Sequence, residues 1–132
     1  MALTYESVVD GLAKRVPGFH TEYRELPHVA FGDLVSFLNS ARVSGAESEF
    51  DRLLFVILAF IEDMAASGDA RLADLVEVSF LENLHNLGPK CPEVLRRLGP
   101  MTAHLRTKYE ASWGRIFEED SRAVPSRTQY LP

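Results

Sequence analysis

The longest apolar run of the sequence, LLFVILAFI at residues 53–61, constrains the fold more than any other feature. Nine residues are too few to span a bilayer as a helix, so we expect the run to be buried in a protein core. The surrounding segment, 46–69, begins with acidic residues that suit the positive end of a helix dipole. Because its middle is apolar around nearly the whole circumference, we predict that this helix occupies the centre of the domain.

Helical periodicity and capping residues predict the remaining elements. Gly68 is expected to end the central helix and Asp69 to cap the next one, which would give a tight antiparallel hairpin. Gly88 and Pro89 are expected to stop that next helix. The other predicted helical segments are 4–16, a short turn at 19–26, a helix starting near Gly32 within 28–45, a short helix over 91–98 and a last helix over 101–117.

No segment alternates apolar and polar residues between turn dipeptides, as a half-buried strand would. The predicted class is therefore all-α, with about six to seven helices in a bundle or a short α-α superhelix. The 132 residues suit one domain. We predict an all-helical domain over residues 1–116 and an irregular C-terminal tail over 117–132.

Composition and charge indicate the cellular compartment of the protein and the class of its partner. The single cysteine forms no Cys/His cluster with zinc spacing, which favours a reducing compartment or indifference to the redox state. The N-terminal segment lacks the basic start and apolar stretch of a signal peptide, so we expect a cytoplasmic protein with no membrane segment. Residues 1–88 hold 6 Lys/Arg and 14 Asp/Glu, whereas residues 89–132 hold 8 and 5. This acidic majority argues against direct nucleic-acid binding.

A Glu-x-x-His pair, Glu82 and His85, has the spacing that supplies metal ligands in some helical bundles. On a helical wheel with Val76 at zero, the apolar stripe centres near ~40°, whereas Glu82 lies near ~240° and His85 near ~180°. The pair therefore points away from the core, and no second Glu-x-x-His occurs in the chain. We expect no metal and no cofactor.

The same wheel places Glu77 near ~100°, inside the apolar arc. A carboxylate there needs a hydrogen-bonding partner or a cation, or it stays protonated. Glu77 is thus a candidate buried carboxylate: either an edge residue paired with an arginine or a helix N-terminus, or an acid in a cleft. A single carboxylate without a second acid, base or nucleophile does not make a mechanism.

Other reactive side chains do not form a recognisable set. Cys91 precedes Pro92 and lies beside Lys90, which could make its thiol more acidic, but the sequence identifies no base for it. His20, His28 and His104 are scattered along the chain. We therefore predict no catalytic residues and no enzymatic activity.

Acidic residues gather at two places and are the candidate partner-binding residues. They could form an ordinary solvated face, or a docking surface for a basic protein. One group starts the central helix, and the other surrounds the predicted hairpin, where its four members would lie close together. The first group is Glu47, Glu49 and Asp51, and the second is Glu62, Asp63, Asp69 and Asp74.

The stretches AFGDLVSFL, ADLVEVSFLENLHNLG and LGPMTAHL, together with the long apolar helix, resemble a family of small all-helical bacterial proteins without assigned activity. The resemblance covers about residues 26–110. It implies no catalytic residues, and it implies, for some members, a role as immunity proteins of polymorphic toxin systems.

Two hypotheses of different classes follow. The first is a cytoplasmic immunity-type protein that binds and blocks a cognate toxin domain with a basic surface. The second is a non-enzymatic helical adaptor or oligomerisation module with another partner. A hydrolase or metal enzyme built on Glu77, Glu82 and His85 is a third and weaker reading of the same residues.

Overall fold

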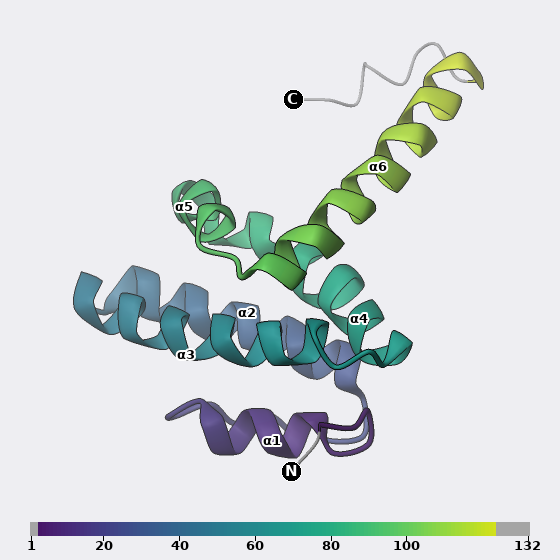
Figure 1. Ribbon diagram of the computed structural model, residues 1–132. Helices are drawn as coiled ribbons and strands as arrows, with labels where there is room; N and C mark the ends of the chain where they lie inside the picture. Colours follow the sequence, from purple (N-terminus) through teal and green to yellow (C-terminus); the bar gives the residue numbers. More distant parts are fainter. Residues whose placement is uncertain (1–2, 124–132) are drawn as a thin grey trace.

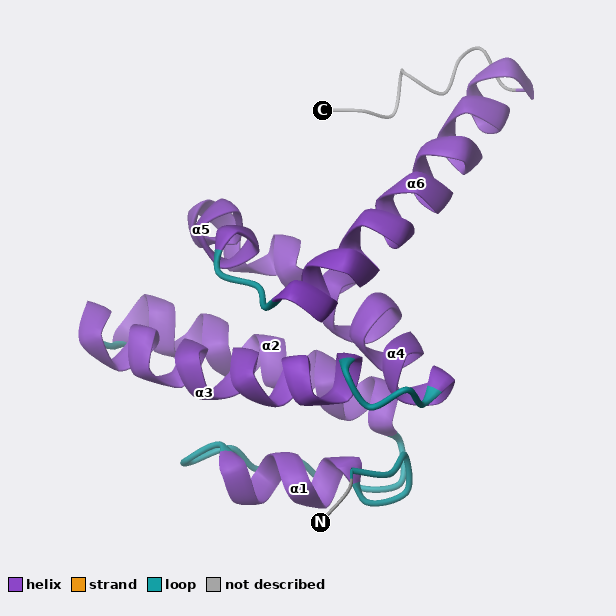
Figure 2. Cartoon of the chain, in the orientation of Figure 1, coloured by secondary structure: helices purple, strands orange, loops and turns teal. Residues whose placement is uncertain are grey.

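The computed structural model describes residues 3–123, and the side chains of residues 3–111. Within this part of the chain every element is helical, which confirms the all-α class (Figure 2). The elements are α1 (Val8–Arg15), α2 (Pro27–Ser44), α3 (Glu47–Ala65), α4 (Ala70–Asp74), the π-helical η1 (Leu75–Leu81), the 3₁₀-type η2 (Glu82–Lys90), α5 (Cys91–Arg96) and α6 (Pro100–Ala123).

The helices stack in layers around α3 (Figure 1). Helices α2 and α3 lie side by side and form the middle layer, with α1 on one side. The composite segment α4-η1-η2 and the start of α6 cover the other side. Beyond its first turns α6 projects away from the body (Figure 1).

The predicted role of the apolar run is confirmed. Most of its side chains are buried, and Leu54, Ile57, Phe60 and Ile61 are completely inaccessible to solvent. Phe55 is the exception, with 71% of its surface exposed. Helix α3 contacts α1, α2, α4, η1 and α6, so it is the central element of the core.

Two predicted stops and one predicted cap are also confirmed. Gly68 and Gly88 adopt positive φ angles of 79° and 57°, which glycine accepts without strain. Gly68 follows α3, and Gly88 kinks the chain at the end of the composite helix. Asp69 caps α4, because its Oδ1 accepts a hydrogen bond of 2.8 Å from the Arg71 amide.

The predicted number of helices is slightly too high, and three boundaries differ. Residues 19–26 form bends and turns instead of a helical turn. Helix α2 begins at Pro27, five residues before Gly32, because proline is favoured in the first turn of a helix. The helix predicted after Asp69 is α-helical only in α4, and continues as η1 and η2. The described residues therefore contain five α-helices of six or more residues, against the six to seven helices predicted.

The last helix extends further than the sequence suggests. Residues 117–123 belong to α6, whereas they were predicted to begin an irregular tail. No glycine or proline interrupts the chain there, and Pro125 is the first residue that disfavours a helical conformation before it. The rest of the predicted tail, 124–132, lies outside the described residues.

Candidate functional site

The seven acidic candidate residues are all engaged within the chain. Five of them form ion pairs with side chains that remain largely exposed, and two hold helix termini. The ion pairs are Glu47 with Lys90, Glu49 with Arg52 (2.7 Å), Asp51 with Arg97 (3.1 Å), Asp63 with Arg15 (3.1 Å) and Asp74 with His28 (3.7 Å).

The group at the start of α3 does come together, and it includes a cation. Carboxylate oxygens of Glu47, Asp51 and Glu93 lie within 4.8 Å of one another. The Lys90 ammonium sits among them: it bonds Glu47 and lies 3.0 Å from Glu93. Hydrogen bonds to Glu47 first, and then to Glu93, raise the pKa of Lys90. This cluster is therefore an ionic contact between α3 and the junction of η2 with α5.

The second group does not form the single patch predicted for it. Its members face four different elements: Glu62 faces α6, Asp63 faces α1, Asp69 caps α4, and Asp74 faces α2. Each carboxylate thus binds a group on a different part of the chain. Their hydrogen-bond and ion-pair partners therefore do not unite these four carboxylates in one cluster.

Glu62 is the most strongly bound member of the group, because it caps α6 from the side. Its Oε1 accepts hydrogen bonds from the Thr102 amide (2.9 Å) and hydroxyl (2.8 Å), and its Oε2 accepts one from the Met101 amide (2.9 Å). Desolvation acts to raise the pKa of Glu62, but these hydrogen bonds outweigh it and lower the pKa. Glu62 is therefore a structural residue.

Gly99 makes this cap possible. A Cβ atom on Gly99 would lie 2.4 Å from Oε1 and 2.5 Å from Cδ of Glu62, closer than atoms can approach. The glycine therefore leaves the space into which the Glu62 carboxylate reaches. The sequence shows a Gly-Pro pair at 99–100, but nothing local indicates the distant carboxylate that needs it.

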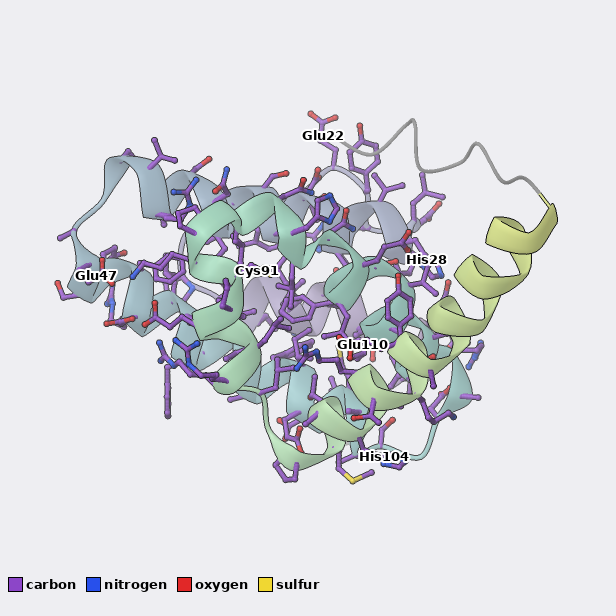
Figure 3. The ribbon with its side chains drawn as sticks, turned by 90° about the horizontal axis from the view of Figure 1, so that it is seen from above. Glu22, His28, Glu47, Cys91, His104 and Glu110 are labelled. Carbon is purple, nitrogen blue, oxygen red and sulfur yellow. The ribbon has the colours of Figure 1, made fainter. Side chains whose placement is uncertain are left out.

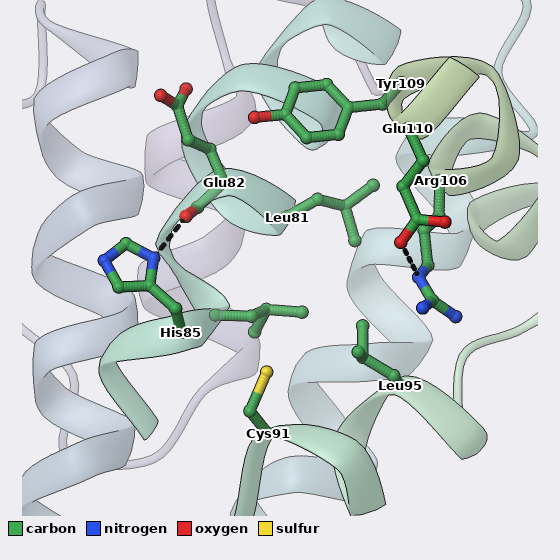
Figure 4. A pocket seen from close by; sticks show the side chains of 9 residues that line it. Leu81, Glu82, His85, Cys91, Leu95, Arg106, Tyr109 and Glu110 are labelled. Carbon is green, nitrogen blue, oxygen red and sulfur yellow. Dashed lines mark hydrogen bonds and ion pairs between the residues drawn. The ribbon is translucent and has the colours of Figure 1, made fainter. Parts of the chain in front are cut away.

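A small pocket of about 170 Å³ gathers several of the reactive side chains (Figure 4). It lies between the end of η1, η2, α5 and α6, and three leucines are among its lining residues. Its polar lining residues are Glu82, His85, Cys91, Arg106, Tyr109 and Glu110. The fold thus brings Cys91 to the same pocket as the Glu82–His85 pair, which sequence spacing alone could not show.

These polar groups are mostly engaged with one another or with the backbone. His85 Nδ1 lies 2.7 Å from the Glu82 carbonyl oxygen, to which it donates, and Arg106 bonds the Glu110 carboxylate at 2.9 Å. Cys91 points its sulfur into the pocket (Figure 4). Burial raises the pKa of the Cys91 thiol, and the Arg106 charge offsets this only in part. The expectation that Lys90 acidifies this thiol is wrong.

Glu77 is half-buried and does not enter the core. Its segment η1 is π-helical, so its residues turn through a smaller angle than the 100° that the wheel assumed. The buried polar residue of this segment is instead Ser79, whose hydroxyl bonds His28 Nδ1. This contact ties η1 to the first turn of α2.

Comparison with known families gives one result. A family model described as a domain of unknown function (DUF7674) matches residues 9–114. The chain belongs to this family. Neither a curated protein nor a solved structure matches the chain.

The DUF7674 match covers the layered body and the first half of α6. The Glu62 cap, the pocket around Cys91 and the carboxylates paired on α3 all lie within it. No helix of the described residues combines the length and apolar character needed to cross a membrane. The family description assigns no activity.

The loop between α1 and α2 is a surface that the sequence reading missed. Residues 22–26 line a shallow hollow, and Tyr23 and Leu26 expose 40% and 55% of their surface. Glu22 and Glu25 of the same loop are exposed and have no ion-pair partner within the described part of the chain. The interspersed acidic and apolar residues of TEYREL, residues 21–26, were the available signal.

Proposed function

We propose that this chain is a cytoplasmic, non-enzymatic protein of the immunity type, which binds a cognate bacterial toxin domain and blocks it by occlusion. One observation carries the proposal: acidic side chains are widely exposed on a body with a net charge of −5. The five ion-paired candidates, from Glu47 to Asp74, have side chains between 45% and 65% exposed. Such a surface attracts a basic partner.

The ion pairs within the chain do not prevent this role. An exposed ion pair contributes roughly 0–1 kcal/mol, because water and salt screen it. A basic partner can therefore replace the internal cation of Asp63 or Asp51 with its own at a small cost in free energy. Glu62 and Asp69 are different, since removing them from their helix termini would break caps.

The helical body suits inhibition by occlusion. Its core is continuous from α1 to α6, so it presents a preformed surface and loses little conformational freedom on binding. A toxin that acts on nucleic acid needs a basic substrate groove, and an acidic inhibitor is complementary to such a groove. The partner would then be the toxin protein itself.

The pocket around Cys91 supports binding better than thiol chemistry. Its thiol has a raised pKa, and its arginine is paired with Glu110. A nucleophilic cysteine needs a low pKa and an adjacent base, and this arrangement works against both. The pocket is more consistent with a hollow in a binding surface.

Co-expression tests the proposal. The chain is expressed together with each toxin-like protein that its neighbouring genes are found to encode, and growth and complex formation are measured. We expect protection from growth arrest and a complex on size-exclusion chromatography that weakens as the salt concentration rises. Absence of both protection and complex would refute the immunity role.

The second candidate is a helical adaptor or oligomerisation module, and the projecting half of α6 favours it (Figure 1). A helix that leaves the body can pair with another helix. Light scattering of the full chain over a range of concentrations separates the two functions. A stable oligomer formed without any toxin would favour the adaptor.

A further inference from the structure

The loop that joins α1 to α2 is held in a fixed conformation. The Thr21 hydroxyl donates a hydrogen bond of 2.9 Å to Asp33 in α2, and Arg24 pairs with Asp10 in α1. The Leu26 amide donates to the Tyr23 carbonyl at 3.1 Å, which closes a turn. The side chains of this loop are thus presented from a defined backbone.

Apolar side chains are exposed together on this loop and beside it. Tyr23, Leu26 and Val29 expose 40%, 55% and 44% of their surface within seven positions of the chain. Val78 of η1 is also exposed, and the bond between His28 and Ser79 brings η1 next to the first turn of α2. A clustered apolar exposure of this kind marks a binding site, whereas single exposed residues do not.

The acidic residues of this surface differ from the ion-paired carboxylates of α3. Glu22 and Glu25 have no cationic partner among the described residues, although Arg24 lies between them, because Arg24 is engaged by Asp10. Figure 3 shows Glu22 directed away from the body and far from Glu47, whose carboxylate is neutralised by Lys90. A basic group that approaches Glu22 or Glu25 has no internal cation to displace.

We infer that the face formed by residues 22–26, Val29 and Val78 is the docking surface for the basic partner, which inserts an apolar side chain into the hollow between Tyr23 and Leu26. This inference rests on the proposed function and names the face through which it acts. The apolar centre supplies the contact area, and the two unpaired carboxylates select a partner segment with lysine or arginine beside its apolar anchor.

Nuclear magnetic resonance with a defined probe tests this inference. The full ¹⁵N-labelled chain is titrated with a synthetic amphipathic helical peptide of lysine and leucine, and the amide shifts are followed. We expect perturbations centred on residues 22–29 and 78 that weaken with added salt. The double substitution Glu22→Lys and Glu25→Lys should weaken the peptide affinity by about tenfold, since two attractions become repulsions.

Two further variants make the test specific. Leu26→Ser should also weaken binding, while Glu47→Lys with Glu49→Lys, which changes the charge equally elsewhere, should leave the perturbations at 22–29 in place. Perturbations centred on residues 47–51, or none at all, would overturn the assigned face. Concentration-dependent shifts of the same residues without peptide would overturn it too, because a second copy would then occupy the face.

The outcome is separable from that of the proposed function. If the toxin complex forms in co-expression and the Glu22→Lys, Glu25→Lys variant retains it, this face is wrong and the immunity role stands. If the peptide maps to the face but no toxin complex forms, the face stands as a binding surface and the immunity role is wrong.

Discussion

Replacing Gly99 with alanine should destabilise the protein through one contact, the Glu62 cap of α6. The new Cβ would lie 2.4 Å from Glu62 Oε1 and 2.8 Å from its Cγ, so the carboxylate must leave its position. Its hydrogen bonds to the Met101 and Thr102 amides and to the Thr102 hydroxyl are then lost. Because Thr102 is only 1% exposed, water cannot replace them fully.

The magnitude follows from these groups. Loss of a side-chain cap costs roughly 0.5–2 kcal/mol, and a buried donor left without an acceptor costs roughly 1–3 kcal/mol. Against this, Gly→Ala in an allowed conformation stabilises by about 0.4–1 kcal/mol through the unfolded state. We therefore expect Gly99→Ala to lower the free energy of unfolding by about 1–2 kcal/mol.

The same substitution should reverse its effect in a Glu62→Ala background. There the cap is already gone and the clash is removed, so the added methyl group should be neutral or stabilising by up to ~1 kcal/mol. Urea unfolding followed by circular dichroism measures all four corners of this double-mutant cycle. Equal destabilisation by Gly99→Ala in both backgrounds would refute the reasoning.

Gly32→Ala is the matched control. Gly32 lies inside α2, and a Cβ atom there would meet nothing within 4 Å. Alanine is the better helix former, so this variant should be stabilised by about 0.5–1 kcal/mol in both backgrounds. The control separates the general effect of glycine replacement from the effect of the Glu62 contact.

Three further results are expected. Desolvation acts to raise the pKa of Glu62, but its hydrogen bonds keep this pKa below the ordinary value of 4.5. The contribution of Glu62 to the free energy of unfolding is therefore present above that pH and is lost as the pH falls through the lowered pKa. The urea midpoint of Glu62→Gln should accordingly fall less on acidification than that of the wild type. Burial raises the pKa of Cys91 above 9.0 despite the Arg106 charge. Iodoacetamide should therefore modify Cys91 at neutral pH at least about tenfold more slowly than it modifies a cysteine peptide, and an equal rate would contradict this. Lys90→Met leaves Glu47 and its neighbouring carboxylates to repel one another, so its melting temperature should rise with NaCl more than that of the wild type, and parallel salt curves would speak against the cluster.

Elements that depend on nearby residues were predictable from the sequence. The run at 53–61 identifies the central helix because burial on all sides requires apolar residues on all sides. Gly68, Asp69 and Gly88 mark boundaries because each solves a local backbone problem within one turn. Such features need no knowledge of the rest of the chain.

Features that depend on helix geometry or on distant partners were not predictable. The wheel assumed 100° per residue, whereas η1 is π-helical and turns through a smaller angle per residue. The cations that neutralise Asp63, Asp51 and Glu47 lie 48, 46 and 43 residues away along the chain. Local sequence patterns identify the carboxylates but not the cations that the fold places beside them.

These distant ion pairs change what the acidic composition means. A carboxylate such as Asp51, held by Arg97 across two helices, contributes less to the field that a partner experiences than an unpaired carboxylate does, since its charge is partly compensated within a few ångströms. The field is then dominated by carboxylates without such a neighbour, and Glu22 and Glu25 are two of them. The clustered carboxylates that stand out in the sequence are therefore largely paired with cations of the same chain. The short loop before α2, which carries Glu22 and Glu25, is the better candidate for the contact with the partner.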